Sequence, residues 1–570
     1  MSTSSIDAKM FSQMFLAAAY NLKSNKEWIN ELNVFPVPDG DTGTNMTMTI
    51  TSAVRELEGL GDDFDMMSLC KSVSSGSLRG ARGNSGVILS QLLRGFCKAV
   101  RDHAEIDVPA AAAGMDKAVE TAYKAVMKPK EGTILTVAKG VAEKSRELVN
   151  AGETDIDKYL TEVIEYGDQV LASTPDMLPV LKQAGVVDSG GQGLIQVLKG
   201  ALEGLHGKVL TAEEVLAEEE ASEEERQAEG EIPELSADEG LKYGYSTEFV
   251  IVLDRPANLW NPKTEKDFKH FLDSIGDTKV CEKDDNEGVV KVDLESNDPG
   301  LAIEKALMYG QLVKIKVENL RAAKKAKEEA AAGQPAPSQE TPADSEQMPK
   351  KDVAFIAVCA GDGLAEIFRG LGVDYVISGG QTMNPSTEDI LEAVEKVNAD
   401  TVFVLPNNKN IIMAANQAAI LSKDRKIIVI PTKTVPQGIT AVINYMPDVD
   451  PEVNCDNMTQ EIAKVKSAEV TYAVRDTVLD DVEIHQGDMM ALGDSGILAT
   501  GKERDETTID SLRKMVTPST SLISVYYGAD VTEQDAETFG DKVRSEFANC
   551  DVEVQKGGQP IYYYILSAEE

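Results

Sequence analysis

Two aspartates stand two residues apart in the short segment Pro38-Asp39-Gly40-Asp41-Thr42-Gly43. Gly40 allows the backbone to turn sharply, so the carboxylates of Asp39 and Asp41 can face one point. Mg²⁺ takes oxygen ligands and commonly binds one or two carboxylates together with the phosphates of a nucleotide. The segment is therefore a candidate nucleotide and metal site, to which Asn33 could add a neutral oxygen. The alternative is an ordinary Asp-Gly surface turn.

A glycine-rich stretch, Gly76–Phe96, forms a second candidate site, because Gly83 and Gly86 bracket Asn84 and Ser85 just before an apolar helical pattern. Glycines let a backbone approach a ligand closely, and the first-turn N–H groups of a helix favour an anion such as phosphate. A helix cap with close helix packing is the alternative at this position.

Two further breaks in the helical pattern, Lys130–Thr136 and Gly185–Leu194, could form loops around the same pocket. The chain contains no GxxxxGK[ST] segment, which argues against a P-loop ATPase. It also lacks the HRD and DFG segments of protein kinases.

The elements that must position these residues are predicted to be helices. From about Ile6 to Leu205 the apolar residues recur at helical spacing, and alternating strand patterns are almost absent. Residues 1–205 should therefore form an all-helical domain. Residues 206–240 should form an acidic linker, because Ala212–Glu239 is rich in glutamate, short of large apolar residues and self-repelling.

The rest of the chain is predicted to hold two domains with β-sheets. Residues 241–320 alternate as strand, helix, strand, strand, helix and strand, the split βαβ order of an α+β domain. Residues 321–351 are rich in Ala, Pro, Glu and Lys and should be a flexible tether. Residues 352–570 should form an α/β domain with a parallel layer over about 352–450.

The amino-acid composition of the chain argues against some classes of binding partner. The chain has 570 residues, and 56 basic against 96 acidic side chains give a formal net charge of −40. Such a charge repels nucleic acids and anionic membrane surfaces. No basic-then-apolar start and no apolar run of roughly 18 residues is present, so we expect a cytoplasmic protein with no integral membrane segment. The six cysteines lie far apart without a CxxC pair, which is typical of buried, reduced thiols.

Three long motifs resemble a known family: Leu32–Met46 (LNVFPVPDGDTGTNM), Ser77–Gly95 (SLRGARGNSGVILSQLLRG) and Gly185–Leu194 (GVVDSGGQGL). They are similar to the nucleotide-binding domain shared by the ATP-binding subunit of dihydroxyacetone kinase and the catalytic subunit of bacterial fatty acid kinase. Gly379–Ile390 (GGQTMNPSTEDI) and Leu405–Ala415 (LPNNKNIIMAA) extend the resemblance to the fatty acid kinase subunit over nearly the whole chain.

The resemblance implies a barrel of antiparallel helices with ATP and two Mg²⁺ at one end. Asp39 and Asp41 would hold the ions, and Asn33 stands where the dihydroxyacetone kinases use a third aspartate. The residues implied to contact the nucleotide are Thr42, Gly43, Thr44, Asn45, Gly83, Asn84, Ser85 and Gly86, with Asp188, Ser189 and Gly190 at its far end.

The implied reaction is phosphorylation of a fatty acid, giving an acyl phosphate for phospholipid synthesis. A fatty carboxylate is already ionised at neutral pH and can attack the γ-phosphate in line, with Mg²⁺ offsetting the repulsion between two anions. The helical domain shows no obvious tunnel for an acyl chain. The resemblance therefore implies a separate fatty-acid-binding carrier of the DegV-like kind, which docks on the C-terminal domain, and a homodimer.

Two other functions stay open. A kinase of a small hydroxyketone would need a substrate-holding histidine module, and none of His103, His206, His270 and His485 lies in such a motif. A non-catalytic, ATP-gated adaptor would use the same nucleotide site without chemistry.

Two more motifs look like cofactor sites, but we expect neither of them to bind the cofactor. Gly361-Asp362-Gly363 follows a strand like a dinucleotide-binding turn, but Glu366 takes the third glycine position and would repel a pyrophosphate. Relatives carry a Cys and two His where this chain has Ser246, Asp293 and Glu295, so we predict no zinc there. Asp293 and Glu295 are either solvated or ligands of Mg²⁺ or Ca²⁺.

Overall fold

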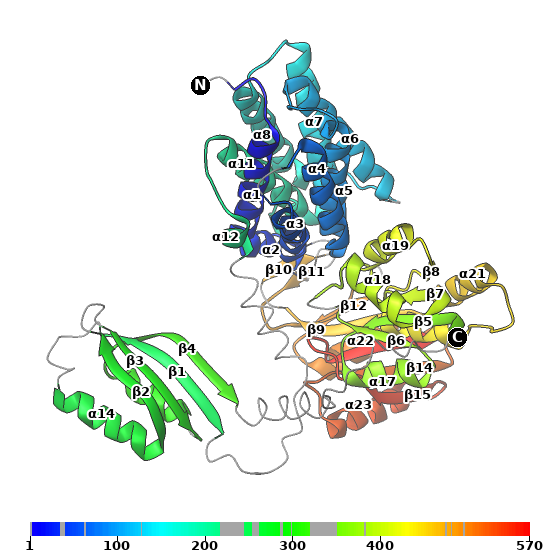
Figure 1. Ribbon diagram of the computed structural model, residues 1–570. Coiled ribbons are helices and arrows are strands. Elements are labelled where there is room, and N and C mark those ends of the chain that lie inside the picture. Colours follow the sequence, from blue (N-terminus) through cyan, green and yellow to red (C-terminus); the bar gives the residue numbers. More distant parts are fainter. Residues whose placement is uncertain are drawn as a thin grey trace, which may run out of the picture. The chain divides into compact units, whose positions relative to one another are not determined.

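Figure 1 shows the computed structural model of the chain, which describes residues 3–34, 40–61, 64–126, 128–216, 244–253, 262–284, 289–297, 299–319, 350–380, 383–473, 476–479, 482–493 and 496–570. Met1–Glu220 and Glu346–Glu570 together form one compact unit, and Ala221–Ser345 forms a second. Most of the two predicted linkers lies outside the described residues. The domain boundaries drawn from the sequence stay predictions.

The N-terminal region is helical, as predicted. Its helices are α1 (Ala8–Ser24), α2 (Lys26–Glu31), α3 (Thr42–Glu58), α4 (Met66–Arg79), α5 (Gly83–Val100), α6 (Val108–Ala125), α7 (Ile134–Asn150), α8 (Ile156–Ala172), α9 (Thr174–Met177), α10 (Pro179–Ala184), α11 (Ser189–Leu205) and α12 (Ala212–Leu216). The long helices contact one another in chain order from α3 to α8, and α11 contacts both α8 and α1. One large apolar core lies among them.

Aspartates begin several of these helices. Asp7, Asp65 and Asp107 each stand at an N-cap and accept a hydrogen bond from a first-turn backbone N–H, at 2.8, 2.8 and 2.9 Å. A capping carboxylate satisfies a donor that has no partner within the helix and favours the positive end of the helix dipole. These caps fix where the helices start.

One short helix lies within the range predicted for the acidic linker. Helix α12 packs on the helical core, where Val215 and Leu216 are buried. Thr211 and Glu214 cap the helix reciprocally: the Glu214 N–H donates to Thr211 Oγ1 (3.1 Å), and the Thr211 N–H donates to Glu214 Oε2 (2.8 Å). Two apolar side chains and a capping box outweigh the charge repulsion over this short piece.

The unit Ala221–Ser345 contains the predicted strand and helix order. Its elements are β1 (Tyr245–Val252), α14 (Pro262–Ile275), β2 (Gly276–Asp284), β3 (Val289–Ser296), α15 (Pro299–Ala306) and β4 (Gln311–Asn319). The strands pair antiparallel in the order β2-β3-β1-β4. Phe268 and Leu272 of α14 and Ala302 of α15 share a core with alternate residues of β1 and β3.

The parallel layer near residue 352 is also present, with one strand that the sequence did not reveal. Its elements are β5 (Lys351–Cys359), α17 (Asp362–Gly370), β6 (Tyr375–Ser378), α18 (Thr387–Lys396), β7 (Ala399–Leu405), α19 (Ile412–Leu421), β8 (Lys426–Val429), α20 (Val435–Ile443) and α21 (Pro451–Ile462). The order is β6-β5-β7-β8, all parallel. Apolar clusters fill both faces, so β5 is buried along most of its length. The missed strand β6 is only four residues long.

The last hundred residues form a mixed six-stranded sheet and a small hairpin. The elements are β9 (Lys466–Tyr472), β10 (Thr477–Leu479), β11 (Val482–Ile484), β12 (Met489–Gly493), β13 (Gly496–Gly501), α22 (Arg504–Met515), β14 (Leu522–Tyr527), α23 (Glu533–Glu546), β15 (Asp551–Lys556) and β16 (Tyr564–Glu569). The sheet order is β13-β12-β9-β16-β14-β15, and β10 pairs with β11. The α/β character predicted for the C-terminal region is confirmed.

The thiols agree with the sequence-based expectation where they can be seen. Cys70, Cys97 and Cys359 are buried, and Cys455 and Cys550 are partly buried. The side chain of Cys281 is outside the described part of the chain. None of the helices described here is both long and apolar enough to cross a bilayer.

Candidate nucleotide and metal site

Asp41 lies at the start of α3, directly after the predicted turn. Gly40 has φ +63°, a left-handed conformation that glycine adopts without strain. Asp41 is only 8% exposed and neighbouring Asn33 only 3%. Asp39, the other predicted ligand, lies outside the described residues.

Two carboxamides hold the Asp41 carboxylate. Asn33 Nδ2 lies 3.5 Å from Asp41 Oδ1, so the structure brings these two predicted ligands together. Asn384 Nδ2 donates to Asp41 Oδ2 at 2.6 Å. Asn384 comes from the C-terminal region and was not predicted as a site residue, although it lies within the motif Gly379–Ile390 that carried part of the family resemblance.

The first turn of α3 is fixed by α2. Asn30 Oδ1 accepts from the Thr44 N–H at 3.1 Å, and Asn30 Nδ2 donates to Thr44 Oγ1 at 3.0 Å. A Cβ on Gly43 would lie 2.2 Å from the Lys26 carbonyl oxygen, so only glycine permits this approach. Contacts of Thr42, Gly43, Thr44 and Asn45 with phosphate stay predictions.

The glycines at the start of α5 serve close helix packing. Gly83 has φ +58°, and a Cβ there would meet Asn45 Nδ2 at 2.6 Å. A Cβ on Gly86 would meet Thr49 Oγ1 at 2.3 Å. The packing alternative is therefore realised here, and it brings the start of α5 against α3. Phosphate contacts of Asn84 and Ser85 stay predictions.

Asp188 caps α11 at the same end of the domain. Its Oδ2 accepts from the Gly191 N–H at 2.7 Å, and Ser189 Oγ donates to Thr42 Oγ1 at 3.2 Å. Burial raises the pKa of Asp188 to about 6, against the opposing effect of the N–H groups of Gly191 and Ile134. Although part of the residue is exposed, neighbouring atoms enclose its carboxylate.

Three helix starts therefore meet around Asp41. Those of α3 and α11 are joined by the bond between Ser189 and Thr42, and those of α3 and α5 by the contact between Gly83 and Asn45. Each of these helices has 17 or 18 residues, and each turns the positive end of its dipole toward this region. Such an end of a helical domain suits an anion with several negative charges.

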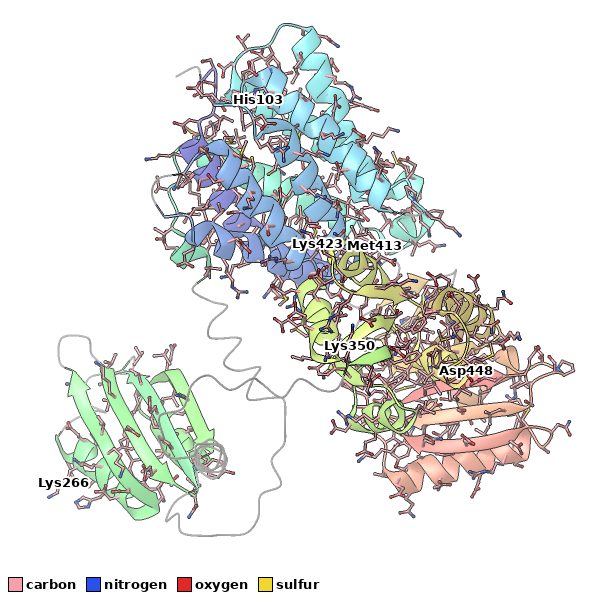
Figure 2. The ribbon with its side chains drawn as sticks, turned by 45° about the vertical axis from the view of Figure 1, so that its right-hand side comes forward. His103, Lys266, Lys350, Met413, Lys423 and Asp448 are labelled. Atoms are coloured by element: carbon pink, nitrogen blue, oxygen red, sulfur yellow. The ribbon has the colours of Figure 1, made fainter. Side chains whose placement is uncertain are left out.

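The C-terminal region packs directly against this end. Ala81 and Val87 belong to the apolar cluster formed by α18, α19 and the four-stranded sheet, and Met413 of α19 contacts this cluster and the helical core (Figure 2). Polar contacts accompany it: Asn84 Nδ2 donates to Asn410 Oδ1 at 3.0 Å. Hairpin strand β10 also contacts α10.

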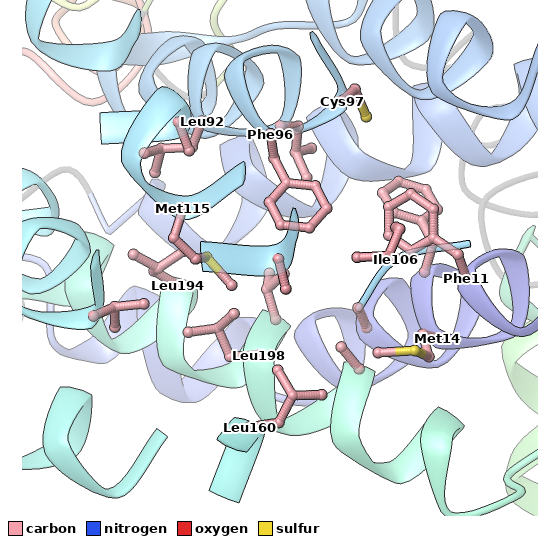
Figure 3. Close-up of a pocket in the computed structure, with 18 of the residues that line it drawn as sticks. Phe11, Met14, Leu92, Phe96, Cys97, Ile106, Met115, Leu160, Leu194 and Leu198 are labelled. Atoms are coloured by element: carbon pink, nitrogen blue, oxygen red, sulfur yellow. The ribbon is translucent and has the colours of Figure 1, made fainter. Parts of the chain in front are cut away.

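An apolar cavity lies inside the helical region (Figure 3), where the sequence suggested no tunnel. Its volume is about 140 Å³. Phe11 of α1, Phe96 of α5, Met115 of α6 and Leu194 of α11 are among the side chains that line it. The residues predicted to bind the nucleotide do not line this cavity.

The Gly361 turn is closed by the chain itself. A Cβ on Gly361 (φ +113°) would lie 2.5 Å from the Gly557 carbonyl oxygen, and the Leu364 N–H donates to that oxygen at 3.0 Å. Backbone therefore fills the space that a pyrophosphate would need, which supports a tight turn.

The histidines show no link to the site. His206 contacts Asp157 at 2.7 Å, and His103, His270 and His485 are exposed. In the described part of the chain, no hydrogen bond joins His103, His206 or His485 to Asp41 or to the starts of α3, α5 and α11.

Asp293 and Glu295 are partly exposed and lie on the face of β3 opposite its buried residues. Lys279 Nζ is 3.6 Å from Glu295, and Ser246 is the cross-strand partner of Glu295. Burial raises the pKa of Asp293, and the charges of Glu248 and Glu295 add to the shift. The described residues contain no cluster of three or more His, Cys, Asp or Glu side chains arranged to hold a metal ion.

Comparison with known proteins covers the chain from end to end. Residues 36–203 match the DAK2 domain, residues 242–327 the middle domain of the FakA-like fatty acid kinase proteins, and residues 354–569 the C-terminal domain of the same proteins. Protein YloV of Bacillus subtilis (strain 168) is 42% identical over 574 residues, which cover 100% of both chains.

Two solved structures show weaker likenesses. The fatty acid kinase B3 protein of Streptococcus pneumoniae, loaded with linoleic acid, aligns at 15% identity and a TM-score of 0.26 over 32% of this chain and 76% of its own. The dihydroxyacetone kinase from C. freundii, in complex with AMP-PNP and Mg²⁺, aligns at 16% identity and a TM-score of 0.27 over 36% of this chain and 34% of its own. Both scores are too low to establish a shared fold. The full-length identity and the three domain matches do establish kinship: the chain belongs to the FakA-like fatty acid kinase family, with a DAK2 domain ahead of the family's middle and C-terminal domains.

Proposed function

We propose that this chain is the ATP-binding catalytic subunit of a fatty acid kinase, which phosphorylates a fatty acid presented by a separate, DegV-like binding protein. One observation carries the proposal: in a member of this family, three helix starts converge on a buried carboxylate. That arrangement supports binding of a polyphosphate together with a cation.

The residues around Asp41 fit a magnesium ion. Asp41 supplies carboxylate oxygen, and Asn33, whose Nδ2 faces Asp41, also carries a neutral carbonyl oxygen. Hard oxygen donors of this kind suit Mg²⁺ and do not suit zinc. In the proposed site Asp41 and Asn33 hold ions together with Asp39, and two ions are expected. When bound, Mg²⁺ supplies charge neutralisation between the phosphates and the attacking carboxylate.

The chain's own part in the reaction is positioning. The N–H groups of Thr44 and Gly191 are already bonded to Asn30 and Asp188. In the proposed site the other N–H groups in the first turns of α3, α5 and α11 would face the phosphates, with Thr42, Asn45, Ser85 and Ser189 at those turns. The burial of Asp41 keeps bulk water from its carboxylate. No general base is needed, because the fatty carboxylate is already ionised. Phosphoryl transfer depends on such positioning more than on covalent help.

Transfer to a fatty acid tests the proposal. The purified chain is incubated with Mg²⁺, ATP, oleate and a candidate DegV-like carrier, and acyl phosphate is trapped with hydroxylamine. Asp41→Asn keeps the side-chain shape but removes the charge, and we expect a loss of about 100-fold or more, as for other groups that stabilise charge during the reaction.

The matched control is Asp168→Asn, which removes an exposed carboxylate paired with Lys199 on the same helical region. This variant should retain wild-type activity. Acyl phosphate formation that survives Asp41→Asn would refute the proposed site. Phosphorylation of dihydroxyacetone in place of oleate would favour the small-molecule kinase, and nucleotide binding without turnover on either substrate would favour the adaptor.

A further inference from the structure

Asn384 belongs to the C-terminal region, but its side chain contacts Asp41, the predicted metal ligand of the helical region. Its side chain is buried, with 2% of the residue exposed, and its Nδ2 donates to Asp41 Oδ2 at 2.6 Å. The two residues are 343 positions apart in the chain. A contact this short between a neutral donor and a carboxylate is a charge-assisted hydrogen bond, roughly twice as strong as a neutral one.

Asn384 is itself held in place by the helical region. Arg82, the residue just before α5, donates from Nη1 to the Asn384 carbonyl oxygen at 3.0 Å and lies 3.2 Å from Asp389 Oδ2. The Thr387 N–H donates to the Ala81 carbonyl oxygen at 3.1 Å. The backbone around Asn384 is thus fixed against the start of α5, while its side chain reaches the start of α3.

Asp389 strengthens this arrangement from the other side. Its Oδ2 accepts from the Ser386 N–H at 2.6 Å, and Ser386 Oγ accepts from the Asp389 N–H at 3.0 Å. This capping box fixes the first turn of α18, so the residues that contact Arg82 and Ala81 form a rigid group.

Each carboxylate oxygen has two lone pairs, so a hydrogen bond from Asn384 to Oδ2 is compatible with a cation on the same carboxylate. Side chains that hydrogen-bond a metal ligand from outside fix its orientation, and their loss typically weakens metal binding about 10–100-fold. We propose that Asn384 is a positioning residue for the magnesium site: by orienting Asp41, the C-terminal region sets the metal affinity of the helical region. The inference rests on the proposed function only in that Asp41 holds the ion.

A second hydrogen bond between the helical and C-terminal regions is the control for a purely structural role of Asn384. Gln91 Nε2 of α5 donates to Gln417 Oε1 of α19 at 2.8 Å, and both side chains are buried. Gln417→Met removes this hydrogen bond at nearly constant volume without touching Asp41. If the hydrogen bond of Asn384 only held the two regions together, the loss of either contact should have the same effect.

The test measures metal binding directly. Mn²⁺ binding to the full-length chain is titrated by electron paramagnetic resonance in the presence of a slowly hydrolysed ATP analogue. Asn384→Leu, which keeps the shape but removes the donor, should weaken Mn²⁺ binding about 10–100-fold, and Gln417→Met should leave it unchanged. In turnover, the Mg²⁺ concentration for half-maximal rate should rise in Asn384→Leu, while the rate at saturating Mg²⁺ should change little.

Wild-type Mn²⁺ affinity in folded Asn384→Leu would overturn the inference, and so would an equal loss in Gln417→Met. If thermal denaturation shows that Asn384→Leu does not fold, Asn384→Ser is titrated instead, and weakened binding is again required. The binding assay needs no fatty acid, so it tests the role of Asn384 independently of the proposed function. If the wild type makes no acyl phosphate but Asn384→Leu weakens its Mn²⁺ binding, only the proposed function is refuted. If the wild type makes acyl phosphate but Asn384→Leu binds Mn²⁺ as tightly as the wild type, only the inference is refuted.

Discussion

Two neutral amides approach the buried carboxylate of Asp41. Asn33 and Asn384 reach its two oxygens at 3.5 and 2.6 Å. An amide donor is neutral, so each of these two contacts orients the carboxylate without cancelling its charge.

Asp188 should give the protein a measurable dependence of stability on pH. The folded state raises the pKa of Asp188 from 3.8 to about 6, so between these values it binds a proton that the unfolded chain releases. The free energy of unfolding contributed by this group therefore falls as pH rises from about 4 to 6, by at most about 3 kcal/mol, and is constant above that range.

Asp188→Asn keeps a capping oxygen for Gly191 and removes the titration. Relative to the wild type, the variant should gain stability as pH rises from 4 to 6 and keep that gain at pH 7.5. Urea denaturation at several pH values measures the difference. A wild-type minus variant difference that stays constant over this range would contradict the raised pKa.

The helices act together through their starts. The start of α5 meets α3 because Gly83 and Gly86 allow a closer approach than a Cβ would permit, and Gly43 does the same between α3 and α2. The start of α11 is joined to α3 by the hydrogen bond from Ser189 to Thr42. The sequence motif that suggested phosphate binding is therefore also a packing motif. Both roles are compatible, since the close packing of α5 on α3 brings the positive ends of these two helix dipoles together.

Gly86→Ala should destabilise the helical region. Its Cβ would lie 2.3 Å from Thr49 Oγ1 and 3.1 Å from the Asn45 carbonyl oxygen, so α5 must shift away from α3. Overpacking of this kind costs about 1–3 kcal/mol. Thermal denaturation measures the loss, and nucleotide binding should weaken with it.

Gly59→Ala is the matched control at the end of α3. Gly59 has φ −68° and ψ −10°, and its added Cβ would meet only the Glu56 carbonyl oxygen at 3.6 Å. This substitution should stabilise the protein by about 0.4–1 kcal/mol through the unfolded state. Equal melting temperatures for the two variants would argue against the close contact of α5 with α3.

At the scale of the whole molecule, the helical region and the C-terminal region belong to one compact unit. Ala81 and Val87 of the helical region lie in an apolar cluster with the four-stranded sheet. A side chain from the C-terminal region, Asn384, completes the surroundings of Asp41. The proposed metal site thus depends on both regions, and a partner that moved one against the other would change it.

Val87→Asp should open this contact. Val87 is 2% exposed, so a carboxylate there would be buried without a partner, which is strongly destabilising. Opening the contact would let water hydrate the charge and so relieve this cost. The readout is hydrogen exchange of the Thr387 amide. Thr387 is the first residue of α18 and has no acceptor within the helix, so its protection depends on the Ala81 carbonyl oxygen.

Exchange of the Thr387 amide should be faster in Val87→Asp than in the wild type. Met67→Asp, at a residue that is 52% exposed on α4, is the control and should not alter it. Unchanged protection in Val87→Asp would show that the apolar cluster does not hold the two regions together.

Local patterns predicted most of the elements and part of the site. Helical periodicity identified the N-terminal helices, and short runs of apolar and β-branched residues identified β1, β5, β7 and β14. The short strand β6 and the hairpin β10-β11 carry too few residues for a periodic signal. The pairing of Asn33 with Asp41 followed from the motif. The pairing of Asp41 with Asn384 could not, because nothing local to either residue indicates a partner 343 positions away.

The most direct test of this account is the position of the metal. Crystals of the full-length chain with Mn²⁺ and a slowly hydrolysed ATP analogue would locate the ion by its anomalous scattering. We predict an ion within about 2.0–2.3 Å of an Asp41 carboxylate oxygen, with phosphates at the starts of α3, α5 and α11. Phosphates bound elsewhere in the molecule, with no ion at Asp41, would contradict the account.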